Sequence, residues 1–436
     1  MNVVYKAVPG GQLSGKFRVP GDKSISHRSI MLGSLAEGVT HVSGFLQGED
    51  SLATLEAFRS MGVKIEGPHD GEVRIQGVGL RGLAAADKPL NLGNSGTSMR
   101  LLSGLLAGQT FESELTGDES LSKRPMRRVT EPLATMGAVI HTAGGGTAPL
   151  VIEGGHALHG IHYDMPVASA QVKSCLLLAG LYAQGQTCVT EPAPTRDHTE
   201  RMLQGFGYTV ERRGATVCLQ GGGKLTATDL DVPADISSAA FFMVGASIAS
   251  GSDLLLEHVG INPTRIGVIN ILRQMGADIS LQNEKTVSGE PVADIRIKSA
   301  RLQGIHIPED QVPLAIDEFP VLFVAAACAQ GQTVLTGAHE LRVKESDRIQ
   351  VMADGLVALG VNARPTDDGM IIDGGALGGG RVDSHGDHRI AMAFAIASLR
   401  ASSGIEIHDC ANVNTSFPGF VELACAAGLN ISVQQS

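Results

Sequence analysis

The chain has 436 residues, of which 43% are hydrophobic, so it can bury large cores and its length suggests two or three domains. A formal net charge of −11 and an aromatic content of 4%, with no Trp, argue against a nucleic-acid-binding surface. The longest apolar runs are about half as long as a membrane crossing requires. The N-terminus also lacks the layout of a signal peptide. We therefore expect a cytoplasmic protein without membrane or nucleic-acid partners.

The six cysteines are scattered along the chain, and none forms a C-x-x-C pair. Four of them lie in apolar runs, which favours buried, reduced thiols. The cysteines are Cys175, Cys188, Cys218, Cys328, Cys410 and Cys425.

One unit recurs six times along the chain, at spacings of 66 to 80 residues. In each copy an apolar helix ends near a turn glycine, and a short β-like stretch follows in most copies. A second, more amphipathic helix then stops at another glycine, which supplies the left-handed cap conformation. The turn glycines are Gly38, Gly108, Gly185, Gly251, Gly331 and Gly404.

The first helix of the units is apolar nearly all round, as in residues 239–248 and 321–329, so these helices belong inside a lobe. The sequence thus predicts an α/β protein of two similar lobes. Each lobe contains three helix–strand–helix–strand repeats, with buried inner helices and outer sheets. We expect residues 20–233 to form the N-terminal lobe and residues 1–19 plus 234–436 to form the C-terminal lobe.

Polar and cationic residues cluster where these inner helices begin, for example in Lys23-Ser24 and Arg28. Ser24 is predicted to be a helix N-cap. Ordinary caps explain the Ser, Thr, Asn and Asp residues but not the cations, because Lys and Arg are disfavoured at a helix N-terminus. A bound anion resolves this conflict. The other clusters are residues 93–100, 168–173, 235–238, 315–318 and 385–389.

The second helices begin with charged segments that allow two interpretations. Residues 122–128 contain four cations in seven residues, and residues 342–348 mix both signs of charge. Either segment can be a solvated face, the latter with surface pairs spaced i,i+4. A Lys-Glu pair followed by Asp-Arg also suits acid–base chemistry beside a phosphate. Asp317 also allows a purely structural interpretation, because it can cap a helix that begins at Glu318.

Two nucleotide-loop matches are chance events in a glycine-rich chain. Residues 10–16 fit G-x-x-x-x-G-K, but Phe17 stands where Ser or Thr is needed to hold Mg²⁺. Residues 77–82 fit G-x-G-x-x-G, but no long helix follows. His385, Asp387 and His388 suggest a metal site, yet no second ligand cluster supports it. We expect neither a metal nor a cofactor.

Seven motifs together resemble the EPSP synthase (3-phosphoshikimate 1-carboxyvinyltransferase) family, and its second-class bacterial sequences in particular. The resemblance runs from about residue 20 to about residue 420. The motifs are Pro-Gly-Asp-Lys-Ser-Ile-Ser-His-Arg (20–28), Gly-Asn-Ser-Gly-Thr (93–97), Ser-Lys-Arg-Pro-Met (122–126), Ser-Ala-Gln (169–171), Thr-Arg-Asp-His (195–198), Arg-Val-Lys-Glu-Ser-Asp-Arg (342–348) and Asp-His-Arg (387–389).

This resemblance implies the enolpyruvyl transferase fold, an inside-out α/β barrel of two lobes with the active site in the cleft between them. It implies a step of aromatic amino acid biosynthesis in the shikimate pathway, run by a monomer without metal or cofactor. In that step the enolpyruvyl group of phosphoenolpyruvate passes to the 5-hydroxyl of shikimate 3-phosphate, and phosphate is released. Two anionic substrates require convergent cations, as the helix starts independently suggest.

The resemblance also assigns roles to individual residues. Asp317 accepts the hydroxyl proton, and Glu345 with Lys23 moves the methylene proton. Shikimate 3-phosphate is held by Lys23, Ser24, Arg28, Ser169, Gln171, Arg196, Asp317 and Lys344. Phosphoenolpyruvate is held by Lys23, Gly96, Arg124, Gln171, Arg348 and Arg389. Gly96 lacks the methyl group found in some herbicide-resistant members, so we expect sensitivity to glyphosate.

Three rival functions are weaker. The related transferase that acts on UDP-N-acetylglucosamine uses a cysteine in the loop that corresponds to residues 110–125, where this chain has none. An RNA-end cyclase with similar lobes conflicts with the acidic charge. A non-catalytic anion-binding scaffold predicts that loss of the Asp317 carboxylate changes nothing measurable.

Overall fold

In the computed structural model, which describes residues 3–435, the chain forms two compact units. The N-terminal unit comprises Gly21–Val232 and the short segment Val287–Glu290. The C-terminal unit comprises Pro233–Thr286 and the other described residues before Gly21 and after Glu290. The segment Val287–Glu290 holds the turn between two strands of the C-terminal unit, and the sequence analysis did not anticipate its place in the other unit.

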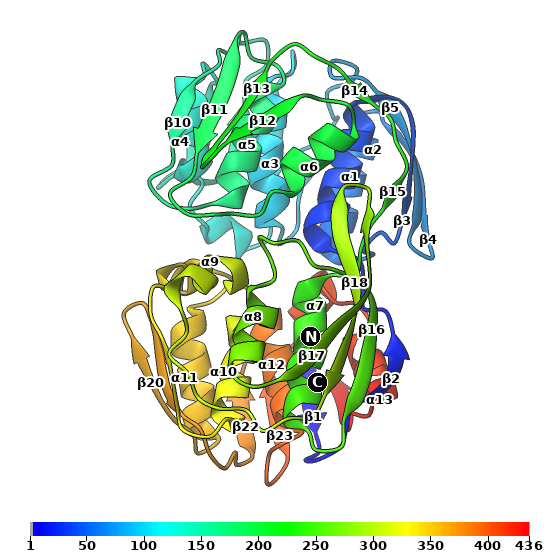
Figure 1. The fold of residues 1–436 in the computed structure, drawn as a ribbon. Coiled ribbons are helices and arrows are strands. Elements are labelled where there is room, and N and C mark those ends of the chain that lie inside the picture. Colours follow the sequence, from blue (N-terminus) through cyan, green and yellow to red (C-terminus); the bar gives the residue numbers. More distant parts are fainter. Residues whose placement is uncertain (1–2, 436) are drawn as a thin grey trace. The chain divides into compact units, whose positions relative to one another are not determined.

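The N-terminal unit contains three inner helices, α1, α3 and α5, and three sheets (Figure 1). The sheets have the strand orders β14-β3-β5-β4 (with β15 also on β3), β6-β7-β9-β8 and β10-β11-β13-β12. Its helices are α1 (Lys23–Leu35), α2 (Glu49–Ser60), α3 (Gly96–Ala107), α4 (Arg127–Thr135), α5 (Ala170–Gly180) and α6 (His198–Gly205), with a 3₁₀ turn at Leu121–Lys123. Its strands are β3 (Ala36–Ser43), β4 (Lys64–His69), β5 (Glu72–Val78), β6 (Leu90–Asn91), β7 (Ser113–Thr116), β8 (Ile140–Ala143), β9 (Thr147–Ile152), β10 (His162–Asp164), β11 (Gln186–Thr190), β12 (Val210–Arg213), β13 (Thr216–Gln220), β14 (Leu225–Thr226) and β15 (Leu230–Asp231).

The C-terminal unit repeats this plan with inner helices α7, α10 and α12, each of which contacts the other two. Its sheets have the orders β17-β18-β16-β2, β19-β21-β20 and β22-β23-β1-β24. Its helices are α7 (Ile236–Ile248), α8 (Gly267–Gln274), α9 (Val312–Ala315), α10 (Phe319–Cys328), α11 (Arg348–Ala358), α12 (His388–Ala397) and α13 (Phe420–Ala427), with 3₁₀ turns at Glu309–Gln311, His339–Val343 and Ala411–Thr415. Its strands are β1 (Val3–Ala7), β2 (Ser14–Phe17), β16 (Asp253–Gly260), β17 (Asp278–Val287), β18 (Glu290–Lys298), β19 (Gln332–Leu335), β20 (Asn362–Thr366), β21 (Gly369–Asp373), β22 (Gly380–Asp383), β23 (Ile405–His408) and β24 (Ile431–Gln435).

The strand pairing shows how one repeat closes. β10 pairs with β11 in parallel, and β11 and β12 both pair antiparallel with β13. Parallel neighbours need a crossover connection, and α5 provides it between β10 and β11. The apolar face of the sheet then packs on that helix. The predicted α/β architecture of helix–strand repeats is confirmed.

Burial of the inner helices follows from their composition. Every residue of α7 is buried, as are nine of the ten residues of α10. Each fully buried Leu or Phe side chain contributes about 1.5–3 kcal/mol of hydrophobic stabilisation. In the N-terminal unit α3 and α5 approach closely because Gly104 has no side chain. A Cβ atom there would lie 2.1 Å from the carbonyl oxygen of Cys175.

Two of the cysteines contradict the expectation of reduced thiols. Cys188 on β11 lies opposite Cys218 on β13, and the two form a disulfide. Apolar runs identify buried cysteines but carry no information on strand register, so the sequence could not reveal this pair. The other four cysteines, Cys175, Cys328, Cys410 and Cys425, are free thiols.

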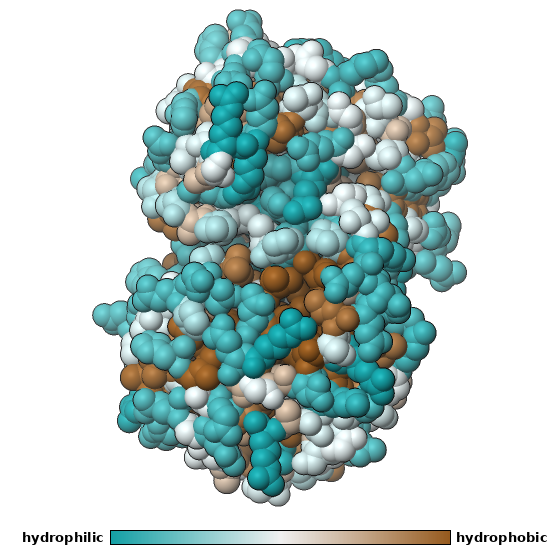
Figure 2. Space-filling view, viewed as in Figure 1, coloured by the Kyte–Doolittle hydropathy of each residue, from teal (hydrophilic) through white to brown (hydrophobic). Residues whose placement is uncertain are grey.

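Hydrophilic side chains cover most of the visible face of each unit, and apolar side chains gather near α8 of the C-terminal unit (Figure 2). Within residues 3–435, no helix is both long enough and apolar enough to span a bilayer.

A buried ion-pair network joins three elements of the N-terminal unit. Lys173 on α5 is fully buried, and its Nζ lies 3.0 Å from Glu191 Oε2 and 2.6 Å from Glu200 Oε1. Glu191 follows β11, and Glu200 belongs to the first turn of α6. Burial by itself would raise the pKa of Glu191, but Lys173 and the hydroxyl of Thr195 outweigh it and lower that pKa. Lys173 therefore holds the start of α6 against α5.

Replacing Lys173 by Met should destabilise the N-terminal unit by about 3–5 kcal/mol, because two buried carboxylates lose their cation. Urea unfolding monitored by circular dichroism measures this change. Lys224→Met is the matched control, since Lys224 is 71% exposed and pairs with Glu37 at 3.3 Å. It should have little effect. Equal unfolding midpoints for the two variants would contradict the structural role of the network.

Candidate active site

The start of α1 gathers the first predicted residues. Asp22, not Ser24, is the N-cap, since its carboxylate accepts a hydrogen bond of 2.9 Å from the amide of Ile25. The prediction for Ser24 was wrong because both residue types can cap and the backbone decides between them. Ser24 is partly exposed in the first turn. The Lys23 ammonium forms an ion pair with the buried carboxylate of Asp50.

Arg28 is buried one turn further along α1. Its Nε and Nη2 donate to the hydroxyls of Thr199 (2.7 Å) and Ser174 (2.9 Å), and its Nη1 donates to the carbonyl oxygen of Ser24 (2.9 Å). Burial lowers the pKa of Arg28 to about 10, and the cation of Arg196 acts in the same direction. Arg196 therefore lies near enough to Arg28 for the two charges to repel each other.

The start of α3 forms a second group with the start of α5. Ser95 caps α3, and a Cβ atom at the next residue, Gly96, would lie 3.2 Å from Nη1 of both Arg100 and Arg124. Arg100 donates to Gln171 Oε1 at 2.5 Å, and Gln171 Nε2 donates to Thr97 Oγ1 at 3.0 Å.

The flanking residues of this group are also fixed. Arg124 donates to Asn94 Oδ1 at 2.8 Å, and Ser169 caps α5. In contrast, Lys123 is exposed and pairs with Glu119 at 2.6 Å, and Arg127 and Arg128 are exposed as well. A solvated face thus describes those three cations but not the partly buried Arg124.

The C-terminal unit contains a separate group centred on Arg348. The side chain of Arg348 is 1% exposed, and its Nε lies 2.8 Å from Asp387 Oδ2. Its Nη2 donates to Glu345 Oε2 at 2.6 Å, and its Nη1 donates to Asp317 Oδ1 at 3.3 Å. Burial acts against the charge of Arg348, but the three carboxylates outweigh it and raise its pKa. The interpretation of residues 342–348 as a surface lattice is therefore wrong.

Asp317 is held by three cations, which are Arg348, Lys344 and Arg389. Its Oδ1 lies 3.3 Å from Lys344 Nζ, and its backbone carbonyl accepts a hydrogen bond of 3.0 Å from Arg389 Nη1. The alternative role of Asp317 as a helix cap is not observed. α10 begins at Phe319, its N-cap position is Glu318, and no side chain caps it.

Four residues of these groups form contacts within the site but are absent from the roles assigned in the sequence analysis. They are Asp50, Arg100, Glu318 and Asp387. Arg100 lies one turn after Gly96 within a motif already singled out, so its i,i+4 position was a usable signal. Glu318 is buried beside Asp317, and its Oε1 lies 3.7 Å from Arg389 Nη1. Only the tertiary structure reveals that contact.

The two groups differ in charge balance. At the helix starts of the N-terminal unit, the cations Lys23, Arg28, Arg100, Arg124 and Arg196 gather, and the acids near them include Asp22, Asp50, Glu200 and Glu290. In the C-terminal unit the three cations Lys344, Arg348 and Arg389 lie among four carboxylates, those of Asp317, Glu318, Glu345 and Asp387. The first group suits binding of anions, and the second holds carboxylates suited to proton transfer.

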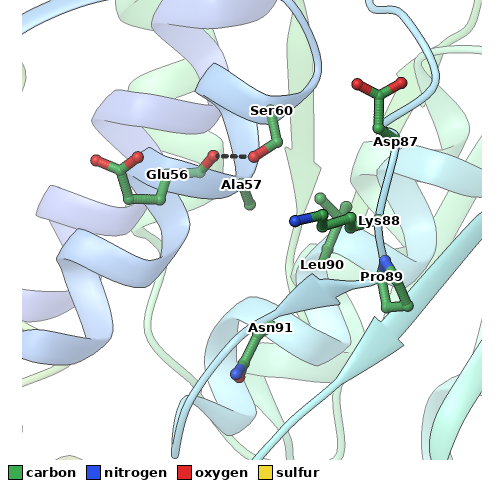
Figure 3. A pocket seen from close by; sticks show the side chains of 8 residues that line it. All are labelled: Glu56, Ala57, Ser60, Asp87, Lys88, Pro89, Leu90 and Asn91. Carbon is green, nitrogen blue, oxygen red and sulfur yellow. Dashed lines mark hydrogen bonds between the residues drawn. The ribbon is translucent and has the colours of Figure 1, made fainter.

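A surface hollow of about 410 Å³ on the N-terminal unit lies apart from these residues. It is bounded by α2 and the segment from Asp87 to Asn91, and the Lys88 amine extends into it (Figure 3). None of the predicted site residues lines it. Among residues 3–435, no group of three or more His, Cys, Asp or Glu side chains is placed to hold a metal ion.

Comparison with known proteins decides between the candidate families. The model of the EPSP synthase (3-phosphoshikimate 1-carboxyvinyltransferase) family matches residues 8–423. The 3-phosphoshikimate 1-carboxyvinyltransferase of Methylococcus capsulatus is 72% identical over 432 residues, which cover 99% of each chain. The chain belongs to the EPSP synthase family. This confirms the family predicted from the motifs.

Further relatives of the EPSP synthase family agree in sequence and fold. The 3-phosphoshikimate 1-carboxyvinyltransferase of Alkalilimnicola ehrlichii is 71% identical over 97% of this chain and 95% of its own. A solved structure of EPSP synthase from Acinetobacter baumannii superposes with a TM-score of 0.91 at 63% identity, covering 99% of this chain and 100% of that chain.

Replacing Arg348 by Met should destabilise the C-terminal unit by about 3–5 kcal/mol, because the fully buried Asp387 loses its cation. Arg348→Lys should recover only part of this loss, since an ammonium cannot reproduce the planar fork. Urea unfolding measures both changes. Arg364→Met is the control, because Arg364 is 54% exposed and lies 3.7 Å from Asp373. Unfolding of Arg348→Met at the wild-type midpoint would contradict this role.

Proposed function

We propose that the protein transfers the enolpyruvyl group of phosphoenolpyruvate to the 5-hydroxyl of shikimate 3-phosphate and releases phosphate. The observation that carries the proposal is the group around Arg348. It joins Asp317, Lys344, Glu345 and Arg389 through ion pairs and hydrogen bonds, in a chain 72% identical to a 3-phosphoshikimate 1-carboxyvinyltransferase. A scaffold that only binds anions does not need a base and an acid among the cations.

We assign anion binding largely to the helix starts of the N-terminal unit. Shikimate 3-phosphate is held by Lys23, Ser24, Arg28, Ser169, Gln171 and Arg196, together with Asp317 and Lys344. Phosphoenolpyruvate is held by Lys23, Gly96, Arg124 and Gln171, together with Arg348 and Arg389. The support for this assignment is the concentration of cations at these helix starts, together with the amide groups of helix first turns, which bind phosphate and carboxylate oxygens.

We assign proton transfer to the carboxylates of the C-terminal unit. An ionised carboxylate offers only acceptor oxygens, and Asp317, held by Lys344 and Arg348, can take the proton of the substrate hydroxyl. Glu345 donates to the methylene carbon, with Lys23 as the alternative donor. The chemistry requires two groups, because the hydroxyl loses a proton while the methylene carbon gains one.

The reaction then has two steps. In the first, the substrate oxygen bonds to the central carbon of phosphoenolpyruvate as its proton leaves to Asp317, and the double bond takes a proton to become a methyl group. In the second, the methyl group of this tetrahedral intermediate returns a proton to the same shuttle. The carbon–oxygen bond to phosphate breaks, the double bond reforms, and the released phosphate takes up the proton that Asp317 accepted, which restores the carboxylate. Cations on the phosphate stabilise the leaving group. No metal or cofactor takes part in these proposed steps.

Release of phosphate from phosphoenolpyruvate, measured with and without shikimate 3-phosphate, tests the proposed function. Release that depends on both substrates, with formation of the enolpyruvyl ether, is expected. Release that instead requires UDP-N-acetylglucosamine would favour the function of the related transferase. No release with either acceptor would favour a non-catalytic anion-binding scaffold. The predicted monomeric state and cytoplasmic location stay predictions.

Asp317→Asn should reduce kcat at least about 100-fold, because an amide cannot accept the hydroxyl proton. The KM values should change less, since the amide can still hydrogen-bond. Steady-state phosphate release gives both quantities. Asp354→Asn, an exposed substitution on α11, should behave as wild type. A kcat within twofold of wild type for Asp317→Asn would remove Asp317 from the mechanism.

Gly96→Ala should weaken binding of phosphoenolpyruvate and of glyphosate. The added methyl group would lie 3.2 Å from the guanidinium nitrogens of Arg100 and Arg124, so both must shift. We expect wild type to be inhibited by glyphosate in competition with phosphoenolpyruvate, and the variant to show weaker inhibition and a higher KM for phosphoenolpyruvate. Gly205→Ala, which meets no atom within 4 Å, is the control. Equal inhibition of all three proteins would contradict the assignment of Gly96.

A further inference from the structure

His27 occupies an unusual place for a histidine. It lies on α1, one turn after Lys23, and is fully buried. Its Nδ1 lies 2.7 Å from Thr54 Oγ1 and 3.3 Å from Ser98 Oγ. The reaction described above gives His27 no role, although Lys23 and Arg28 on either side of it are both assigned to the substrates.

The hydroxyls beside His27 continue as a chain of hydrogen bonds. Thr54 Oγ1 on α2 lies 2.6 Å from Ser98 Oγ on α3, and Ser98 Oγ lies 2.7 Å from Ser95 Oγ. Ser95 Oγ also accepts the amide of Ser98 at 3.1 Å and so caps α3. All four side chains belong to residues no more than 1% exposed. The chain links α1, α2 and the cap of α3 without solvent.

The environment of His27 gives this chain a direction. Burial lowers the pKa of His27 well below its usual value, and the cations of Lys23 and Arg28 lower it further, so the ring is neutral. Nε2 is buried and has no hydrogen-bond partner among the described residues. A bare acceptor is tolerated better than a buried N–H without a partner, so the proton belongs on Nδ1. His27 then donates to Thr54. The hydroxyl of Thr54 lies 2.6 Å from Ser98 Oγ and 3.3 Å from the carbonyl oxygen of Asp50, so the shorter contact favours donation to Ser98, and Ser98 donates to Ser95.

We propose that His27 is a positioning residue that, through Thr54 and Ser98, fixes the cap of α3 and thereby the phosphoenolpyruvate-binding start of that helix. The inference rests on the proposed function, because it takes Gly96 and Arg124 as contacts of phosphoenolpyruvate. His27 itself touches neither substrate in this account. It sets the orientation of Ser95, which directly precedes Gly96 in the sequence.

Stability alone does not account for such a chain. Burying hydroxyls and an imidazole costs desolvation free energy, and each hydrogen bond returns only about 0.5–1.5 kcal/mol net. Apolar side chains of similar shape would pack these helices at least as well. Hydrogen bonds differ from apolar contacts in that they fix angles as well as distances, and a connected set fixes them together. The orientation of the α3 cap is what the chain adds.

The effect should be confined to one substrate. Arg28 is held by Ser24, Thr199 and Ser174, none of which belongs to the His27 chain. The chain ends instead at Ser95, beside Gly96. Breaking it should therefore disturb the phosphoenolpyruvate contacts at Gly96 and leave the shikimate 3-phosphate contacts of Ser24 and Arg28 in place. This selectivity distinguishes a positioning role from a general contribution to folding.

The test compares steady-state phosphate release by His27→Leu, His27→Asn and Thr54→Val with wild type. His27→Leu and Thr54→Val interrupt the chain, and we expect each to raise the KM for phosphoenolpyruvate about tenfold, the loss of roughly one hydrogen bond. The KM for shikimate 3-phosphate should stay within about twofold. His27→Asn should restore most of the affinity, because its amide nitrogen can donate from about the position of Nδ1. Ser34→Ala is the matched control, since Ser34 is a buried serine of α1 whose hydroxyl has no hydrogen-bond partner among the described residues.

Several outcomes would overturn the inference. These are equal increases in both KM values, an Asn variant no better than the Leu variant, or wild-type kinetics in the interrupted variants. Urea unfolding of every variant shows whether it is folded, and Ser98→Ala replaces any that is not, with the same selective increase expected. An inactive wild type would refute the proposed function itself. An active wild type without the selective KM change refutes only the role of His27.

Discussion

The charge on the buried guanidinium of Arg348 is the constraint on which the C-terminal half of the chemistry depends. An isolated cation in that position would be costly, so it requires carboxylates, and Asp387, Glu345 and Asp317 supply them. The same requirement draws the start of α11 toward the start of α12 and toward the loop before α10. Acid–base residues from two repeats, and from the starts of three helices, are therefore brought together by one ion-pair network. The geometry that we assign to proton transfer is a by-product of neutralising one buried charge.

The charged groups of the N-terminal unit are arranged differently. Its helix starts concentrate cations, and the positive ends of the helix dipoles add to them. Neutral groups also hold these side chains in place: Arg28 donates to the hydroxyls of Thr199 and Ser174, and Arg124 donates to Asn94 Oδ1. A hydrogen bond to a neutral group fixes a cation without cancelling its charge. His27, which lies between Lys23 and Arg28 on α1 and contacts α2 and α3, is likewise a neutral group and not another cation.

Much of the fold could be predicted from the sequence, because apolar helices and turn glycines are local patterns with a direct physical meaning. α7 and α10 are buried as their composition indicates, and the motifs identified the family. Features set by tertiary contacts could not be predicted. Ser24 and Asp22 are equally good caps in sequence, and the backbone at Asp22 (φ −58°, ψ 122°) decides for the latter. The disulfide depends on the register of β11 with β13, and the burial of Arg348 depends on residues far along the chain.

The turn between β17 and β18 shows how far such tertiary effects reach. Ser288 Oγ accepts the amide of Asp231 at 2.9 Å, Gly289 O accepts Arg201 Nη1 at 3.0 Å, and Glu290 lies 2.7 Å from His198 Nδ1. His198 and Arg201 belong to α6, which also supplies Thr199 to Arg28 and begins two residues after Arg196. Within the N-terminal unit, the segment Val287–Glu290 thus braces the helix that helps to orient Arg28. Because this brace and the Lys173 network hold α6 from different residues, the position of Arg28 rests on two independent supports.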